Sequence, residues 1–132
     1  MKVRHEVLRA AAGDPLGSEH AFIEHHDIVY RDAPSPDQPK PKPIAAPAQG
    51  QWSRRIDPND VMLFRYSALT FNGHRIHYDR QYVTSEEGYD GLIIHGPLTA
   101  TLLMDLACRQ TPDKRLKTFT FRALSPLTHV HE

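Results

Sequence analysis

Strand-forming and turn-forming patterns divide the first third of the chain. Two stretches, 2–10 and 20–31, have the character of extended strands, and the residues between them, 12–18, include Gly, Asp and Pro, which favour turns. This pattern predicts a β-hairpin within residues 1–33. Six of the eleven prolines then fall between Pro34 and Pro47, where few backbone amides can join a sheet. We therefore expect residues 34–51 to form a linker or a strap that lies across a surface.

A short helical pattern follows Trp52. Asp57 as N-cap, Pro58 at the first helical position and Asp60 in the first turn predict a helix that ends near Ala68. Apolar residues surround most of this helix, which indicates burial on more than one side. These residues are Val61, Met62, Leu63, Phe64 and Leu69.

A strongly apolar helix dominates the second half of the chain. Before it, a second helical element is expected to begin near His77 and to carry Tyr78, Gln81 and Tyr82, and residues 92–94 form a short apolar strand. Pro97 then suits the start of a helix over 98–109 that is apolar nearly all round, so this helix belongs in the middle of a domain. Residues 116–124 alternate well enough to predict a further strand.

Composition narrows the class of protein. A chain of 132 residues is long enough for one modest core, and its 16 basic and 16 acidic residues balance, which is typical of neither a nucleic-acid binder nor a polybasic membrane surface. There is no apolar run of membrane-spanning length and no apolar signal core, so we expect a soluble, cytoplasmic protein. Cys108 is the only cysteine, which excludes an intramolecular disulfide, and we expect it to be a small core residue.

Nine histidines suggest proton-transfer chemistry near neutral pH, and two segments of the sequence support this suggestion most strongly. They are YSALTFNGHRIHYD at 66–79 and IHGPLTA at 94–100. The first resembles the hydratase motif of MaoC-like enzymes, in which an acidic residue precedes a histidine by five positions, and the second resembles the entry to the central helix of their hotdog fold. The resemblance covers roughly residues 52–127. It is closest to the branch of mesaconyl-CoA or 3-methylfumaryl-CoA hydratases and type-2 3-hydroxyacyl-thioester dehydratases.

The resemblance implies an α+β hotdog fold, in which a curved antiparallel sheet wraps around the apolar helix. It also implies reversible addition of water to an α,β-unsaturated acyl thioester. His77 suits general acid/base catalysis because an imidazole exchanges protons near pH 7. Asn72 stands where the wider family has aspartate, and because an amide is no base, it would only orient water while His77 makes both proton transfers. Gly96, at the amino end of the helix, would direct its N–H at the developing oxyanion.

Four further residues are candidates for substrate binding: His95, Arg75, Tyr78 and Leu98. Arginines are suited to the phosphates of coenzyme A, and the depth of the pocket behind Leu98 would set the length of the acyl chain. No cofactor is expected beyond coenzyme A as part of the substrate, with acyl carrier protein as the alternative carrier. No metal is assigned, because the histidines show no third ligand at a recognisable spacing.

The pattern leaves alternatives open. The strand count is lower than the roughly five strands of a hotdog sheet, and the hairpin resembles the end of a preceding hotdog repeat. The chain is then a fragment, a truncated form, or a protomer that its partner completes, and exposed sheet edges favour a homodimer. The main rival to an enzyme is an inactive hotdog module that binds acyl thioesters or assembles with an active partner. A third reading is a metal-dependent hydrolase that uses the histidines.

Overall fold

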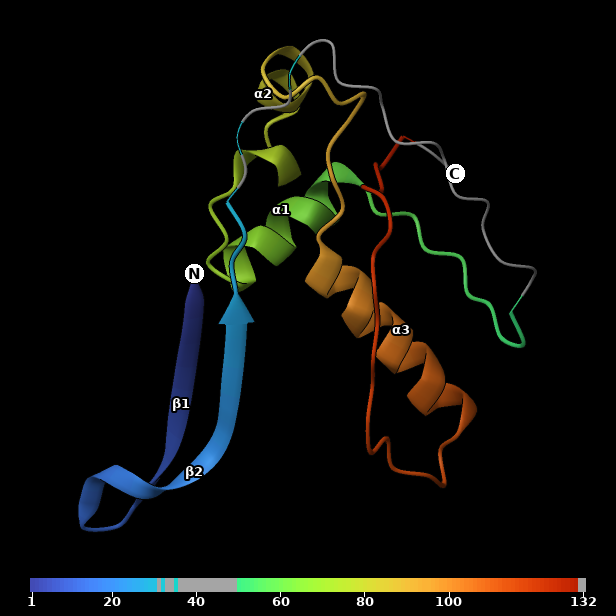
Figure 1. The fold of residues 1–132 in the computed structure, drawn as a ribbon. Helices are drawn as coiled ribbons and strands as arrows, with labels where there is room; N and C mark the ends of the chain where they lie inside the picture. The colour runs from blue at the N-terminus through green and yellow to red at the C-terminus, as the bar shows by residue number, and fades with distance from the viewer. Residues whose placement is uncertain (31, 33–34, 36–49, 131–132) are drawn as a thin grey trace. The chain divides into compact units, whose positions relative to one another are not determined.

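The computed structural model describes residues 1–30, 32, 35 and 50–130. The chain forms two compact units, Met1–Lys42 and Pro43–Glu132, with an antiparallel pair of strands in the first and three α-helices in the second (Figure 1). The α+β class is therefore confirmed. The predicted linker at 34–51 lies almost wholly outside the described residues. No helix in the described part of the chain is long and apolar enough to cross a lipid bilayer.

The first unit contains the predicted hairpin. Strands β1 (Lys2–Ala11) and β2 (Asp14–Asp27) pair in antiparallel register, from Lys2 opposite Asp27 to Ala11 opposite Asp14. The turn is shorter than predicted, because only residues 12 and 13 separate the strands, and Gly13 supplies the positive φ of 89° that a tight turn requires. The strands therefore extend into the segment that its Gly and Pro content predicted to be a turn.

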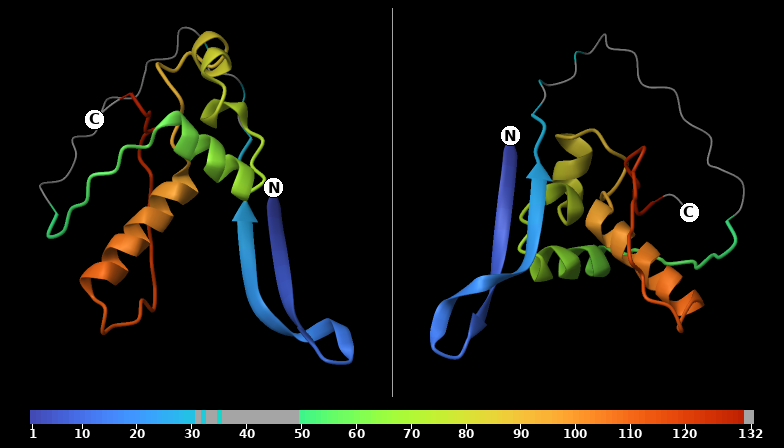
Figure 2. Two further views of the ribbon diagram at one scale, coloured as in Figure 1. Left: turned by 180° about the vertical axis from the view of Figure 1, so that it is seen from behind. Right: turned by 60° about the horizontal axis from the view of Figure 1, so that its bottom comes forward.

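A bulge explains how β2 passes through this segment. The register shifts between Arg9 and Ala11, and Gly17 on the opposite strand has a φ of 64°. A Cβ at Gly17 would lie 2.2 Å from the carbonyl oxygen of Arg9, so only glycine fits there. Bulges bend the strand that carries them, and β2 curves visibly toward the hairpin tip (Figure 2).

The second unit begins with α1 (Asp60–Leu69), whose cap differs from the prediction. Asn59 is the N-cap, and its Oδ1 accepts the backbone N–H of Met62 at 3.0 Å. Asp57 lies two residues too early to reach that N–H, and Pro58 precedes the helix. Predicted burial on several sides is also wrong, because Leu63 and Ser67 are the helix's only buried residues and Phe64 is exposed.

The predicted helical element near His77 forms as two short pieces. A 3₁₀ turn, η1 (Arg75–His77), comes first, and α2 (Arg80–Ser85) follows. Asp79 separates them and caps α2, since its Oδ1 accepts the backbone N–H of Tyr82 at 3.0 Å. This cap fixes where the helix starts and leaves His77 in the 3₁₀ turn.

The long helix α3 (Gly96–Gln110) carries Pro97 in its first turn, as predicted. Its burial was predicted wrongly. Leu98 is its only buried residue, Leu103 is exposed, and Cys108 is an exposed thiol instead of a core residue. Burial all round needs a sheet wrapped around the helix, and the sheet formed by the described residues has two strands. After α3 the chain turns back and runs along it (Figures 1 and 2).

This returning segment includes residues 116–124, which were predicted to be a strand and are not one. Alternation records a preference for extended backbone, but a strand also needs a neighbour to accept its hydrogen bonds. Further on, the chain makes one isolated bridge between Ile93 and Thr128, flanked by bonds from Ile94 N–H to the Leu127 oxygen (2.8 Å) and from His129 N–H to the Leu92 oxygen (3.0 Å). The predicted strand at 92–94 is reduced to this bridge.

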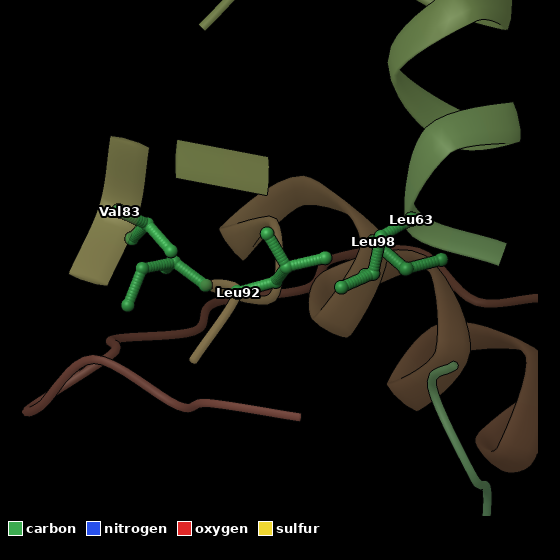
Figure 3. Close-up of a cluster of buried hydrophobic side chains, with 5 residues drawn as sticks. Leu63, Val83, Leu92 and Leu98 are labelled. Atoms are coloured by element: carbon green, nitrogen blue, oxygen red, sulfur yellow. The ribbon is translucent and has the colours of Figure 1, made fainter. Parts of the chain in front are cut away.

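A small apolar core holds the second unit together. Its buried members come from α1, α2, residues 92–93 and the first turn of α3: Leu63, Val83, Leu92, Ile93 and Leu98. Figure 3 shows Val83 beside Leu92 and Leu98 beside Leu63. The backbone N–H of Ile93 also bonds the oxygen of Ile76 in η1 at 3.0 Å. The core therefore fixes η1, α1 and the start of α3 against one another.

Candidate active site

His77 ends η1, and its environment determines which of its nitrogens is basic. The side chain is buried, with 8% of the residue exposed, and Nδ1 lies 2.7 Å from the carbonyl oxygen of Ile93. A carbonyl can only accept, so Nδ1 carries the proton and donates. In the neutral ring Nε2 is then left with a free lone pair. This is the arrangement that a general base requires.

His95 lies directly against His77. The ring centroids are 3.7 Å apart and the planes are inclined by 18°, so the two imidazoles are stacked. His95 is more deeply buried, at 1% exposure, and its Nε2 lies 2.8 Å from Oγ of Ser67 on α1. The ring of Tyr66 meets His95 edge-on at 4.8 Å. Two histidines 18 positions apart in the sequence thus form one compact unit with a buried serine.

Burial keeps both imidazoles neutral at physiological pH. Loss of solvent lowers the pKa of His77; the bond to Ile93 opposes this effect and the nearby His74 ring adds to it. The pKa of His95 is lowered to about 4, chiefly through burial and secondly through its electrostatic interaction with His77. His77 is therefore present as a base at pH 7, whereas His95 takes up no proton in the physiological range.

Asn72 follows a helix end of unusual composition. Phe71 N–H bonds the oxygen of Ala68 (3.4 Å) and Asn72 N–H bonds that of Ser67 (2.9 Å), which is the Schellman pattern that usually places glycine where Phe71 stands. Phe71 accordingly has a positive φ of 54°, and it is 97% exposed. A strained apolar residue thus immediately precedes Asn72. Such strain often marks functional sites.

The side chain of Asn72 is oriented by a backbone contact. Its Oδ1 accepts the N–H of His74 at 3.1 Å, which leaves the amide NH₂ as a donor. Among the described residues no hydrogen bond joins Asn72 to His77. Asn72 is connected to the two histidines through neighbouring residues. The ring of His74, whose N–H bonds Asn72, meets the His77 ring edge-on at 5.7 Å. The backbone N–H of Asn72 is bonded to the oxygen of Ser67, and the hydroxyl of Ser67 is bonded to His95.

An open, mainly apolar cavity of about 310 Å³ borders Asn72. Tyr78, a predicted substrate-binding residue, is at its wall, and its hydroxyl donates to the oxygen of Gly73 at 2.9 Å. Ser67 is part of the same wall and connects the cavity to His95. The complete lining is Phe64, Ser67, Ala68, Phe71, Asn72, Gly73 and Tyr78.

Gly96 is the first residue of α3, directly after His95, so it lies close to the stacked histidines. As the first helical residue it has no acceptor within the helix for its N–H. A Cβ added there would meet nothing within 4 Å, so the space beside it is open. Leu98, predicted to contact the substrate, is a core residue with 6% exposure.

Arg75 faces a different part of the surface. Its guanidinium binds Asp79 at 2.8 Å and lies 4.1 Å above the ring of Tyr82, beside a polar hollow on α2. Its pKa is raised, mainly by the hydrogen bond to Asp79. A phosphate of coenzyme A would have to compete with that carboxylate for the guanidinium.

Sequence reasoning missed Ser67, and the structure places His95, a predicted substrate-binding residue, at 1% exposure against the ring of His77. The sequence spacing did contain one indication of this serine: Ser67 lies one helical turn after Leu63, so a core face at Leu63 places the serine on the same buried face.

The other histidine and carboxylate side chains bear on a possible metal site. In residues 1–30, 32, 35 and 50–130, no group of three or more His, Cys, Asp or Glu side chains is arranged to hold a metal ion.

Comparison with known proteins agrees with the motifs at 66–79 and 94–100. The model of hydroxyacyl-thioester dehydratase type 2 matches residues 2–129. The chain belongs to this family. The resemblance inferred from the two motifs is thereby confirmed, and the match extends beyond the span 52–127 to include the hairpin.

Curated relatives of this dehydratase family match only part of their length. Mesaconyl-C(4)-CoA hydratase of Chloroflexus aurantiacus is 50% identical over 105 residues, which are 79% of this chain and 37% of that protein. The mitochondrial hydroxyacyl-thioester dehydratase type 2 of Schizosaccharomyces pombe is 40% identical over 127 residues, 95% of this chain and 41% of that protein. The chain therefore spans about two fifths of the length of these relatives.

Proposed function

We propose that this chain supplies the acid–base site of a hydratase/dehydratase that acts on α,β-unsaturated acyl thioesters of the enoyl-CoA type. The observation that carries the proposal is the buried bond from His77 Nδ1 to the Ile93 oxygen, because it leaves Nε2 as the base of a neutral imidazole. The family, and relatives named as a hydratase and a dehydratase of thioesters, agree with that chemistry.

The reaction follows from three groups. The NH₂ of Asn72 donates to the oxygen of a water, which turns a water hydrogen toward His77 Nε2. His77 removes that proton as the oxygen bonds to the β-carbon, and the electron pair of the double bond shifts to the thioester oxygen as an enolate. The N–H of Gly96, which has no acceptor within α3 and lies at the positive end of that helix, stabilises this oxygen. Protonated His77 then returns the proton to the α-carbon, so that one water is added and the base is regenerated.

Several finer assignments belong to the same proposal. Mesaconyl-CoA and 3-methylfumaryl-CoA are the first substrates to test, since a relative with 50% identity is named for mesaconyl-C(4)-CoA. The acyl part would occupy the cavity beside Asn72, whose apolar wall includes Phe64 and Phe71. A hotdog fold, a hairpin from a preceding repeat, a homodimer and a cytoplasmic location remain predictions.

The test is turnover by the full chain with crotonyl-CoA and mesaconyl-CoA, followed as loss of the conjugated thioester absorbance. Replacing His77 by Gln should reduce kcat by about 10²–10⁴-fold, because general acid/base catalysis contributes that much. His25→Gln is the matched control, since His25 is exposed on β2 and should leave kcat unchanged. Equal activity of the His77→Gln variant and the wild type would refute the role of His77.

The rival assignment, an inactive module that binds acyl thioesters, predicts a different result. Calorimetric titration would then show binding of crotonyl-CoA with no absorbance change in the wild type. A metal-dependent hydrolase would instead release free coenzyme A, detectable with a thiol reagent, and would lose activity on treatment with a chelator. Hydration releases no thiol, so the three functions are separable with one substrate.

A further inference from the structure

A buried polar atom beside the proposed base lacks a partner among the described residues. Nδ1 of His95 is inaccessible to solvent and has no hydrogen-bond partner in residues 1–30, 32, 35 and 50–130, while Nε2 is bonded to Ser67 at 2.8 Å. Orphaned buried donors are rarer than orphaned acceptors, because an N–H without an acceptor loses its full hydration. The bond to Ser67 therefore favours the tautomer in which Nε2–H donates to Oγ and Nδ1 keeps only a lone pair.

This tautomer also suits the position of His95 in the chain. His95 is the N-cap of α3, and its side chain makes no capping bond. A lone pair is favoured near the positive end of a helix, whereas a second N–H there would meet no acceptor. Burial is the main reason that the ring resists protonation. His95 is thus held as a neutral ring of one tautomer, fixed at one end by Ser67 and against the face of His77 at 3.7 Å.

Other roles for His95 fit the geometry less well. At 1% exposure it does not meet a substrate that approaches from solvent. As a base that activates Ser67 as a nucleophile it would be weak, because its pKa is about 4. A purely structural role leaves unexplained why two imidazoles and a hydroxyl, which an apolar core does not require, are buried together beside His77.

We propose that Ser67 and His95 are positioning residues for His77: Ser67 fixes the ring of His95, and that ring fixes the plane of the His77 imidazole and excludes water from one of its faces. The inference rests on the proposed function of His77 as the general base. The stack would keep Nε2 of His77 aimed at the reacting water. It complements the Ile93 carbonyl, which fixes the opposite side of the ring at Nδ1.

Few other charges act on this pair. His74 faces His77 from the residue before η1, and Tyr66 faces His95 from α1. The first turn of α3 carries no acidic residue. In the described part of the chain, the carboxylate closest in sequence to His77 is Asp79, which is bonded to Arg75 and to the amide of Tyr82. Because His74 also lowers the pKa of His77, the effect of Ser67 and His95 on that titration is measured by substitutions that leave His74 in place.

The decisive measurement is an NMR titration of the imidazole nitrogens in the full chain, with His77 and His95 assigned by single substitution. In the wild type His77 should hold its proton on Nδ1 and His95 on Nε2. In Ser67→Ala, His95 should become a mixture of tautomers and the pKa of His77 should move up toward 6.5, its ordinary value, as water reaches the ring. Ser67→Thr retains the hydroxyl and should restore the wild-type values.

Kinetics give a second readout. Ser67→Ala should lower kcat for crotonyl-CoA by roughly tenfold to a hundredfold, because small misplacement of a catalytic group costs that much. KM should change less than kcat, because Ser67 is only one part of the mainly apolar wall of the acyl cavity. His95→Phe keeps a flat ring against His77 and should lose less activity than His95→Ala. Ser85→Ala, an exposed helical serine that bonds the Gln81 oxygen, is the control for removing a hydroxyl from a helix.

The outcomes separate the two proposals. Wild-type protein without turnover would remove the proposed function, whereas the titration of His77 would still test the positioning role. If Ser67→Ala lowers only the unfolding midpoint, and leaves the tautomers, the pKa of His77 and kcat as they are in Ser85→Ala, the positioning role is overturned.

Discussion

His95 should make this protein less stable in mild acid. In the folded chain its pKa is about 4, against 6.5 for an exposed histidine. As the pH falls through 6.5, the unfolded state binds a proton that the folded state refuses, so the free energy of unfolding decreases. The contribution of neutral His95 to the free energy of unfolding is fully present above pH 6.5 and is lost progressively toward pH 4. The lowered pKa of His77 acts in the same direction.

The magnitude follows from the two pKa values. Between pH 7 and pH 5 the linkage relation gives a loss of about 2 kcal/mol from His95 alone. This is a large share of the roughly 5–15 kcal/mol by which domains are stable. Protonation of the two hairpin glutamates does not obscure this loss of stability. Glu6 and Glu24 have pKa values below 4.5, lowered chiefly by hydrogen bonds to His20 and His5, so they titrate below this window.

Urea denaturation at pH 7, 6 and 5 measures the effect. The comparison is with His95→Gln, whose amide can still donate to Ser67 but does not titrate. This variant should be less stable than the wild type at pH 7, since it loses the ring stack. Between pH 7 and pH 5, however, its free energy of unfolding should fall by about 2 kcal/mol less than that of the wild type. His25→Gln controls for removing an exposed histidine. If His95→Gln and wild type lose the same stability between pH 7 and pH 5, the buried neutral ring is not the cause.

Three further predictions concern the neighbourhood of the site and the hairpin. Asn72→Ala should lower kcat for crotonyl-CoA by about tenfold or more with its acid–base pH profile intact, whereas an altered profile would mean that Asn72 takes part in proton transfer. Phe71→Asn should raise the unfolding free energy by about 1 kcal/mol in urea, because asparagine tolerates the φ of 54°; a loss of stability would show that the exposed phenyl ring is packed in solution. Gly17→Ala should speed amide hydrogen exchange across β1 and β2, since its Cβ would strike the Arg9 oxygen at 2.2 Å, and unchanged exchange would contradict the bulge.

The parts of the fold that were predicted correctly depend on local chemistry. The hairpin, the proline at the start of α3 and the break after α1 follow from residues that limit their own backbone. The N-cap of α1 was misplaced by two residues because Asp57 and Asn59 are both good caps, and only the reach of the side chain to Met62 decides between them. Of these features, the burial of side chains was predicted least accurately. The apolar positions of α3 and the alternation at 116–124 describe surfaces that need a wider sheet, and the described residues form only two strands.

The site shows the same division between local and distant information. Asn72 and His77 could be proposed as site residues because they lie in one continuous motif, and their backbone contacts to His74 and Ile93 are local to that motif or to the adjoining core. The contact between Ser67 and His95 joins positions 28 residues apart, and no pattern in the sequence pairs a serine with a particular histidine. Only the small core, which places α1 beside the first turn of α3, brings them together. A motif can therefore point to a candidate base, whereas the residues proposed to position that base are recognised only from the packing of separate segments.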